Sequence, residues 1–107
     1  YKQKIVDIDE DGTVVTRAHP GKPNRMIRNQ FTDYWIGREH EIKSFPQQLK
    51  EIGESRSVAG RLNGDIESGV LPAGQGAGFI DSILPVTEVI RNIMEEARRL
   101  LVKWDNA

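Results

Sequence analysis

The last part of the chain carries a long amphipathic pattern, and this pattern constrains the fold more than any other feature. From Val86 to Trp104, apolar residues recur in alternating steps of four and three, with other apolar residues beside them. The apolar stripe comprises Val86, Val89, Ile90, Ile93, Met94, Ala97, Leu100, Leu101 and Trp104. Such spacing places these side chains on one face of an α-helix, and Pro85 suits the first turn, where no amide donor is needed. The pattern therefore predicts a helix over residues 85–104.

This helix is too long for the rest of the chain to cover. At about 1.5 Å per residue it measures roughly 30 Å, and charged residues such as Arg91, Glu95 and Arg99 lie mostly on its other face. The other helical segments have few apolar residues to offer. We therefore expect part of the cover to lie outside this chain, and the start at Tyr1 instead of Met suggests that an upstream segment is missing.

Composition restricts the class of protein further. A chain of 107 residues is long enough for one compact domain, and no shift in composition divides it, so we expect a single region over residues 1–107. The net charge of -1 gives no general attraction to nucleic acid or to anionic membranes. The absence of cysteine excludes disulfides and thiolate catalysis and favours the cytoplasm. No stretch is apolar enough to predict a membrane span.

The first residues allow two interpretations. Two short β-prone pieces are separated by Asp11 and Gly12, a turn signal typical of a hairpin. Alternatively, residues 1–8 end a helix, and only residues 13–17 form a strand or an extended link. We favour the second interpretation.

We predict a helical region over residues 26–62. Apolar residues recur at helical spacing from Met26 onward, with a weak point at Gly37. A second helix is predicted to begin at Ser44, because Ser44 and Gln47 have the spacing of a capping box. Its apolar positions are sparse, so we expect it to lie on a surface.

Residues 71–84 form a glycine-rich return toward the C-terminal helix. Gly74, Gln75 and Gly76 only loosely resemble a phosphate-cradling loop, because the Lys-Ser/Thr pair of a P-loop is absent. A backbone so rich in glycine either passes close to a cofactor or another helix, or makes a tight structural connection. The spacing supports both interpretations about equally.

A run of basic residues without acidic neighbours extends along the loop before Met26 and into the helical region predicted to begin there. Guanidinium groups bind phosphate through paired hydrogen bonds, so the run has the chemistry of a phosphate site. The alternative is that these are solvated loop charges or partners of the chain's own acidic residues, and we favour it because surface charges seldom need a specific function. We call Arg17, His19, Lys22, Arg25 and Arg28 the basic cluster.

The sequence offers no constellation for catalysis or metal binding. His19 and His40 are the only histidines, and neither has a second ligand at helical spacing. The serines lack the base and the orienting acid of a nucleophilic site. We therefore assign neither a catalytic residue nor a metal ligand.

Several short pieces of the sequence stand in a characteristic order. They are Thr16-Arg17-Ala18, then Gly21-Lys22-Pro23-Asn24-Arg25 with Arg28-Asn29-Gln30-Phe31, then Phe45-Pro46-Gln47-Gln48, then Ala73-Gly74-Gln75-Gly76-Ala77-Gly78, and the predicted helix from Leu84 to Ala97. Their order and spacing from about Thr13 to Leu101 resemble the nitronate monooxygenase family, formerly called 2-nitropropane dioxygenases. That family also includes FMN-dependent enoyl reductases. Each piece is degenerate, but the ordered set is fairly specific.

The resemblance implies an α/β fold, namely the C-terminal fragment of an FMN-binding TIM barrel that is itself mostly helical with one or two short strands. Residues 26–62 would be a late helical insertion, and the helix over residues 85–104 would pack back on the barrel. A complete barrel takes about 250 residues. This chain would therefore hold only its end, which explains the uncovered stripe.

The resemblance also implies a function for the longer parent protein. With FMN, the parent would oxidise an alkyl nitronate with oxygen, or pass a hydride to an enoyl thioester. This chain would close and shape the pocket and would be inactive alone, because the family's catalytic histidine and most of its flavin phosphate ligands lie upstream of the matched region. The partner would be the remainder of the barrel.

Few site residues carry over from the resemblance. Gly74, Gln75 and Gly76 match the family's Ala-Gly-Gln segment, which we expect near the flavin, so they are the cofactor-binding candidates. The family's Thr-Arg to Arg-Asn segment is expected to be structural. It is matched here by Arg17, Arg25 and Asn29.

A different class of function is also compatible with these patterns. The chain would then be a stand-alone interaction module without catalytic activity, whose C-terminal helix docks a protein partner or self-associates. Nucleic-acid binding is a distant third interpretation, because no aromatic residue is interleaved with the basic cluster.

Overall fold

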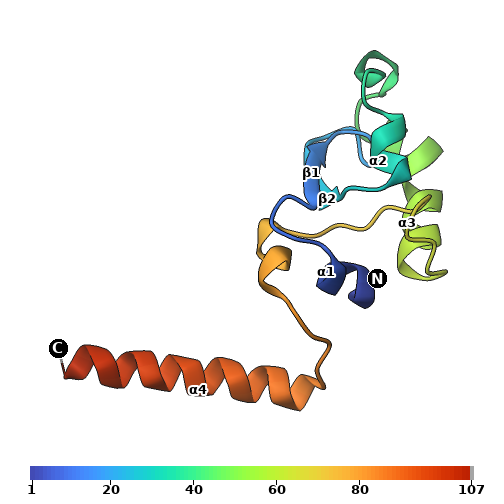
Figure 1. Cartoon of the computed structure of the whole chain (residues 1–107). Coiled ribbons are helices and arrows are strands. Elements are labelled where there is room, and N and C mark those ends of the chain that lie inside the picture. Colours follow the sequence, from blue (N-terminus) through green and yellow to red (C-terminus); the bar gives the residue numbers. More distant parts are fainter. Residues whose placement is uncertain (107) are drawn as a thin grey trace.

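The computed structural model, which describes residues 1–106, contains a two-stranded hairpin (Figure 1). Strand β1 (Thr13–Thr16) runs antiparallel to β2 (Asn24–Ile27). The loop between them turns at Gly21, whose φ of 87° lies in the left-handed region that glycine adopts without strain. A Cβ at Gly21 would also lie 2.5 Å from the backbone nitrogen of Phe45. Glycine therefore lets this loop pack directly on another backbone segment.

The helix predicted to begin at Met26 is wrong at its start. Met26 and Ile27 are fully buried in β2. Strand β1 pairs with one edge of β2, and the return segment pairs with the other, since Met26 bridges to Pro72 and the Ile27 amide donates to the Leu71 carbonyl at 2.8 Å. Apolar spacing could not separate a short buried strand from a helix. Between Met26 and Gly37 only α2 (Gln30–Tyr34) is an α-helix.

The N-terminal residues are helical, as the favoured interpretation predicted. Helix α1 (Lys2–Asp7) precedes the turn at Asp11 and Gly12, so the hairpin interpretation is wrong. The Gly12 carbonyl instead accepts a hydrogen bond from the Arg28 amide at 2.9 Å. The turn is thereby joined to the end of β2.

Helix α2 begins at a reciprocal cap. The Asn29 side-chain oxygen accepts from the Thr32 amide at 3.0 Å, and the Thr32 hydroxyl accepts from the Asn29 amide at 2.9 Å. The Asn29 amide group also donates to the carbonyls of Ile66 at 2.9 Å and Gly69 at 2.7 Å. One nearly buried side chain thus joins α2 to the segment that leads into the return.

Three further helical pieces follow α2. The chain turns at Gly37, with a φ of 79°, into the 3-10 helix η1 (Glu39–Glu41). A π-helical turn, η2 (Leu49–Gly53), then continues directly into α3 (Glu54–Arg61). The region over residues 26–62 therefore consists of a strand and short helices.

The capping box predicted at Ser44 and Gln47 is wrong. The Ser44 carbonyl, and not its hydroxyl, accepts from the Gln47 amide at 2.9 Å. The Gln47 side chain turns the other way and donates to Glu51 at 3.0 Å. The helix that starts there is continued by η2 and lacks a side-chain cap.

The core is small and partly made by backbone contact. Met26, Ile27, Val70 and Leu71 are completely buried. Helix α3 approaches this core through Gly60, where a Cβ would lie 2.8 Å from the Val70 carbonyl oxygen. Close backbone packing explains why α3 needs few apolar side chains.

The glycine-rich return forms the 3-10 helix η3 (Gln75–Phe79), and helix α4 (Val86–Asp105) follows it. Figure 1 shows α4, in red and orange, extending away from everything else, and none of its residues is buried. We call residues 1–79 the compact unit. Residues 1–106 form a small α/β unit whose two strands are too few to close a barrel. Within the same residues, no helix is both long and apolar enough for a bilayer crossing.

Candidate functional site

The segment with the cofactor-binding candidates has an inner and an outer side. Ala77 faces inward and is buried, while Gly74, Gln75 and Gly76 are exposed. Phe79 closes η3 with 85% of its surface exposed. Sequence reasoning missed Phe79, whose only signal was an apolar residue directly after the glycines. We call Gly74, Gln75, Gly76 and Phe79 the outer face of η3. No part of residues 1–106 covers this face, so it is accessible to a cofactor or to another part of a larger protein.

The glycines of this segment divide into two kinds. A Cβ at Gly74 or at Gly76 would meet no heavy atom of the described chain within 4 Å. A Cβ at Gly78 would lie 2.7 Å from both the Cα and the nitrogen of Glu10. The tight structural connection therefore applies to Gly78. Gly74 and Gly76 have no such requirement within the compact unit.

The return segment is fastened to Tyr1 and to strand β2 just before the candidates. The Tyr1 hydroxyl donates to the Pro72 carbonyl, and Pro72 bridges to Met26 on β2. The Ala73 amide reaches the Arg25 carbonyl at 3.4 Å. The candidates thus follow directly after a point that is fixed to the hairpin.

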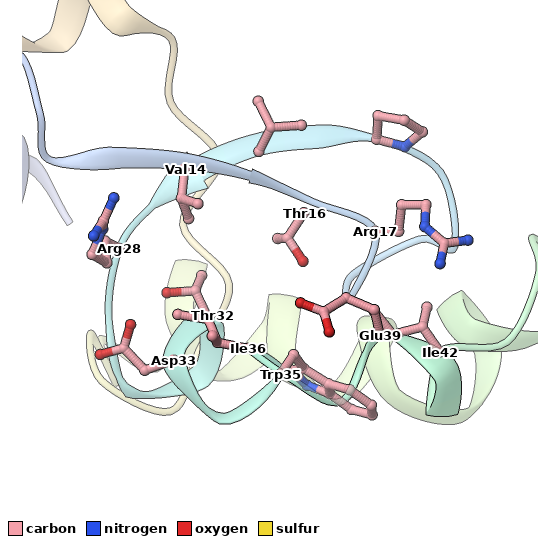
Figure 2. Close-up of a pocket in the computed structure, with 12 residues that line it drawn as sticks. Val14, Thr16, Arg17, Arg28, Thr32, Asp33, Trp35, Ile36, Glu39 and Ile42 are labelled. Carbon is pink, nitrogen blue, oxygen red and sulfur yellow. The ribbon is translucent and has the colours of Figure 1, made fainter.

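A separate pocket of about 280 Å³ lies between the hairpin and α2 (Figure 2). Val14, Trp35 and Ile42 supply apolar walls, and Figure 2 shows the Glu39 carboxylate pointing toward Thr16 of the hairpin. Hydrogen bonds from the backbone amides at Glu39 and Gly37 hold the pKa of the Glu39 carboxyl below its usual value, with smaller contributions from nearby cations. An ionised carboxylate in the lining opposes the binding of a phosphate here.

The basic cluster does not converge on one point. Arg17 and Arg28 line the pocket of Figure 2, together with the acidic Asp33 and Glu39. The remaining members point to other partners. Arg25 donates to the Thr13 hydroxyl at 3.0 Å, Lys22 lies 3.9 Å from the centre of the Phe45 ring, and His19 contacts Asn24 at 3.3 Å. The geometry favours solvated and structural charges over a phosphate site.

The two histidines differ in their surroundings. The Nε2 atom of His19 is buried and has no hydrogen-bond partner among residues 1–106, and burial, followed by the charge of Arg61, lowers the pKa of its imidazole. His40 is exposed in η1. Among residues 1–106 no three acidic or histidine side chains gather as metal ligands would.

The family-like motif around residues 45–48 has a structural residue that sequence reasoning missed. Gln48 is 1% exposed. Its side chain donates to the Ala18 carbonyl at 2.7 Å and accepts from the Lys43 amide at 3.1 Å. Gln48 therefore joins the matched pieces at residues 16–18 and 45–48. In the sequence, its position in the second of these pieces is the one sign of this structural role.

The apolar stripe of α4 is open along its length. Ile90 is 56% exposed, Ile93 61% and Leu101 67%. Exposed apolar side chains continue into the connection before α4, at Ile80, Ile83 and Leu84. Large exposed apolar surfaces are common at interaction sites.

Comparison with known sequences gives a consistent result. A profile of the family described as nitronate monooxygenase matches residues 1–96. A probable nitronate monooxygenase of Staphylococcus aureus is 27% identical over 100 residues, which cover 94% of this chain and 28% of the relative. A hydroxy-methyl-oxo-octahydroindene-carboxyl-CoA dehydrogenase of Mycobacterium tuberculosis is 23% identical over 133 residues, covering 90% of this chain and 37% of the relative.

Solved structures show the same arrangement of elements. FabK from Thermotoga maritima superimposes with a TM-score of 0.81 at 35% identity, over 99% of this chain and 33% of FabK. A single-residue mutant of that FabK gives a TM-score of 0.74 at 31% identity, over 99% of this chain and 30% of the mutant. The chain therefore spans about a third of the length of the proteins it matches.

Proposed function

The chain belongs to the nitronate monooxygenase family, and from this premise we propose that it is the C-terminal part of an FMN-dependent oxidoreductase. In this proposal it helps to close the flavin and substrate pocket of a longer protein, which we call the complete enzyme. Alone, the chain has no redox activity. The compartment we propose is the cytoplasm, on the basis of the cysteine-free sequence.

The observation that carries the proposal is the open apolar stripe of α4. The match to FabK covers 99% of this chain, so it includes α4, and FabK is about three times as long. A helix that projects from the compact unit is therefore compatible with a larger fold that fills the space beside it. Burial of this stripe would stabilise the complete enzyme by about 25 cal/mol for each Å² of apolar surface removed from water.

The width of the stripe favours a barrel as the cover over self-association. Val89 flanks one edge of the stripe, and Met94 and Leu101 flank the other. A two-stranded coiled coil uses a narrower seam, so a single partner helix would leave these flanks exposed. The outer layer of a barrel offers strands below the helix and other helices at its sides.

The candidates fit one wall of a flavin site and not a complete site. Cofactor pockets enclose about 300–1,000 Å³, and two pockets within residues 1–106, of about 280 Å³ and 360 Å³, are lined by residues other than Gly74, Gln75 and Gly76. In the proposal these three residues form an edge that meets FMN, and the barrel supplies the other walls. Bound FMN would supply the redox chemistry. The chain's contribution is a close backbone approach and the Gln75 side-chain amide as a hydrogen-bonding group.

Two substrate classes are compatible with the proposal. One is an alkyl nitronate oxidised with oxygen, as the name of the staphylococcal relative suggests. The other is a thioester, as in the coenzyme A-linked name of the mycobacterial relative. Turnover of the complete enzyme with a nitronate, and separately with an enoyl thioester, would distinguish the two.

Split expression tests whether the chain is part of such an enzyme. We expect the isolated chain to bind FMN weakly or not at all, and co-expression with the separately encoded barrel to restore stoichiometric flavin binding. Flavin absorbance after gel filtration provides the measurement. Tight, stoichiometric FMN binding by the isolated chain would contradict the proposal. A well-folded monomer with α4 covered internally would also count against the proposal.

Two substitutions test the flavin contact itself. Gln75→Ala removes the side-chain amide, and Gly76→Val places a branched side chain where this chain leaves open space. In the complete enzyme we expect both to weaken FMN binding, with the larger effect for Gly76→Val. Unchanged FMN affinity and turnover in both variants would remove Gly74, Gln75 and Gly76 from the site.

A further inference from the structure

We infer that Gly78, with Tyr1 in support, is a positioning residue that holds the outer face of η3 in place for the flavin. The inference rests on the proposed function, because only then does this face meet FMN. Neither residue touches the cofactor in this scheme. Each acts through the backbone of residues 72–79.

The contact at Gly78 leaves no room for a side chain. A Cβ there would lie 2.7 Å from the Cα and the nitrogen of Glu10 and 3.0 Å from the carbonyl carbon of Asp9. Contacts this short do not occur between real Cβ atoms and backbone, so one of the two segments must move.

The partner segment is tied both to itself and to the end of β2 by hydrogen bonds. In the turn after α1, the Asp11 amide donates to the Asp9 carboxylate at 2.9 Å, and the Gly12 amide donates to the Asp9 carbonyl at 3.1 Å. The Gly12 carbonyl is held by the Arg28 amide at 2.9 Å. A side chain at Gly78 would therefore displace η3, and not the turn.

The second anchor lies at the other end of the segment. The Tyr1 hydroxyl donates to the Pro72 carbonyl, and Pro72 also bridges to Met26 in the buried strand β2. Between the two anchors, Gly74 and Gly76 have open space where a side chain would be. The position of the outer face is therefore set by its two ends, and a shift at either end moves it.

Gly78→Ala in the complete enzyme tests the inference against a matched control. Gly60→Ala creates the same kind of clash, with a Cβ 2.8 Å from the Val70 carbonyl oxygen, but in the core at α3. We expect Gly78→Ala to raise the dissociation constant of FMN by about tenfold or more, because small misplacements at a site have large effects. Gly60→Ala should lower the melting temperature about as much as Gly78→Ala does, but should leave FMN affinity nearly unchanged. Flavin fluorescence titration measures the FMN dissociation constant. Thermal melting followed by the visible circular dichroism of the bound flavin measures the melting temperature.

Tyr1→Phe is the milder second variant. It removes only the hydroxyl that binds the Pro72 carbonyl, and we expect a rise of about threefold in the FMN dissociation constant, in line with one lost hydrogen bond. If Gly78→Ala does not fold, this variant decides the question. An FMN affinity that is unchanged in the folded variants, or that changes equally in Gly60→Ala, overturns the inference.

Gly76→Val separates this inference from the proposed function. If Gly76→Val weakens FMN binding and Gly78→Ala does not, the flavin contact stands and only the positioning role of Gly78 fails. If Gly76→Val and Gln75→Ala both leave FMN binding unchanged, the outer face of η3 does not meet the flavin, and the proposed contact fails with it.

Discussion

The compact unit and α4 are stabilised in opposite ways. The compact unit buries a small apolar core and adds polar connections, such as Asn29 and Gln48, and close backbone contacts at glycine. Helix α4 has a long apolar stripe and buries none of it. The compact unit thus buries its apolar core within the chain, whereas the apolar stripe of α4 can be buried only against a surface outside it. Substitutions in the two regions should therefore respond differently to the presence of the barrel.

The largest effect is expected from a charge in the middle of the stripe. In the complete enzyme, Ile93→Asp would bury an unpaired carboxylate and should destabilise the fold by about 4 kcal/mol. In the isolated chain, where Ile93 is 61% exposed, the same variant should leave the melting of the compact unit unchanged and reduce self-association. Chemical denaturation and light scattering measure the two effects.

Val102→Asp is the matched control for this prediction. Val102 also lies on α4 and is 52% exposed, but it stands on the charged face, away from the stripe. We expect Val102→Asp to change the free energy of unfolding by less than about 1 kcal/mol, both in the isolated chain and in the complete enzyme, because exposed substitutions are nearly neutral. Equal losses for Ile93→Asp and Val102→Asp in the complete enzyme would show that the stripe is not the covered face.

A truncation in the compact unit should have the next largest effect, with or without the barrel. Leu71→Ala removes a completely buried side chain and should lower the free energy of unfolding by about 3 kcal/mol. Leu62→Ala removes the same atoms from a residue that is 78% exposed, so it should change stability little in the isolated chain. If both variants destabilise the isolated chain equally, the compact unit does not have the core described above.

Substitutions at Asn29 test the polar connections, with a somewhat smaller expected loss of stability than Leu71→Ala. Asn29→Ala removes the cap of α2 and the two bonds to the Ile66 and Gly69 carbonyls, for an expected loss of about 2 kcal/mol. Asn29→Asp keeps the capping oxygen but sets a carboxylate against two carbonyls, so it should be at least as destabilising. A nearly wild-type melting temperature for Asn29→Asp would mean that only the cap matters.

The same contrast explains which elements could be predicted from the sequence. The helix over residues 85–104 was predicted almost to the residue, since α4 spans Val86–Asp105 and its periodicity is local and uninterrupted. In the compact unit, Met26 pairs with residues on both sides that lie far away in sequence, and its strand was taken for a helix. Long-range pairing overrides local pattern where elements are short.

The candidate site was predictable only as a segment. Composition singled out the glycines, and the family resemblance pointed to Gly74, Gln75 and Gly76. The distinction between these open positions and the crowded Gly78 depends on where Glu10 lies, which no pattern contains. The cap at Asn29 does not fit the capping-box pattern, because it uses Thr32 where a capping box usually has Glu or Gln.

The smallest expected effect concerns pH, and it belongs to the compact unit alone. The pKa of His19 is lowered from its ordinary value of 6.5, first by burial and then by Arg61. Between the pKa of His19 in the folded chain and its value of 6.5 in the unfolded chain, the unfolded chain binds more protons. The contribution of neutral His19 to stability is therefore complete above pH 6.5 and is lost as pH falls through the folded pKa. His19→Gln should flatten the decline of the melting temperature just below pH 6.5, while His40→Gln, which removes the exposed imidazole, should preserve it. An imidazole titration by NMR that places the pKa of His19 at or above 6.5 would mean that its buried Nε2 atom has a partner in solution, and the steeper decline would then have to arise elsewhere.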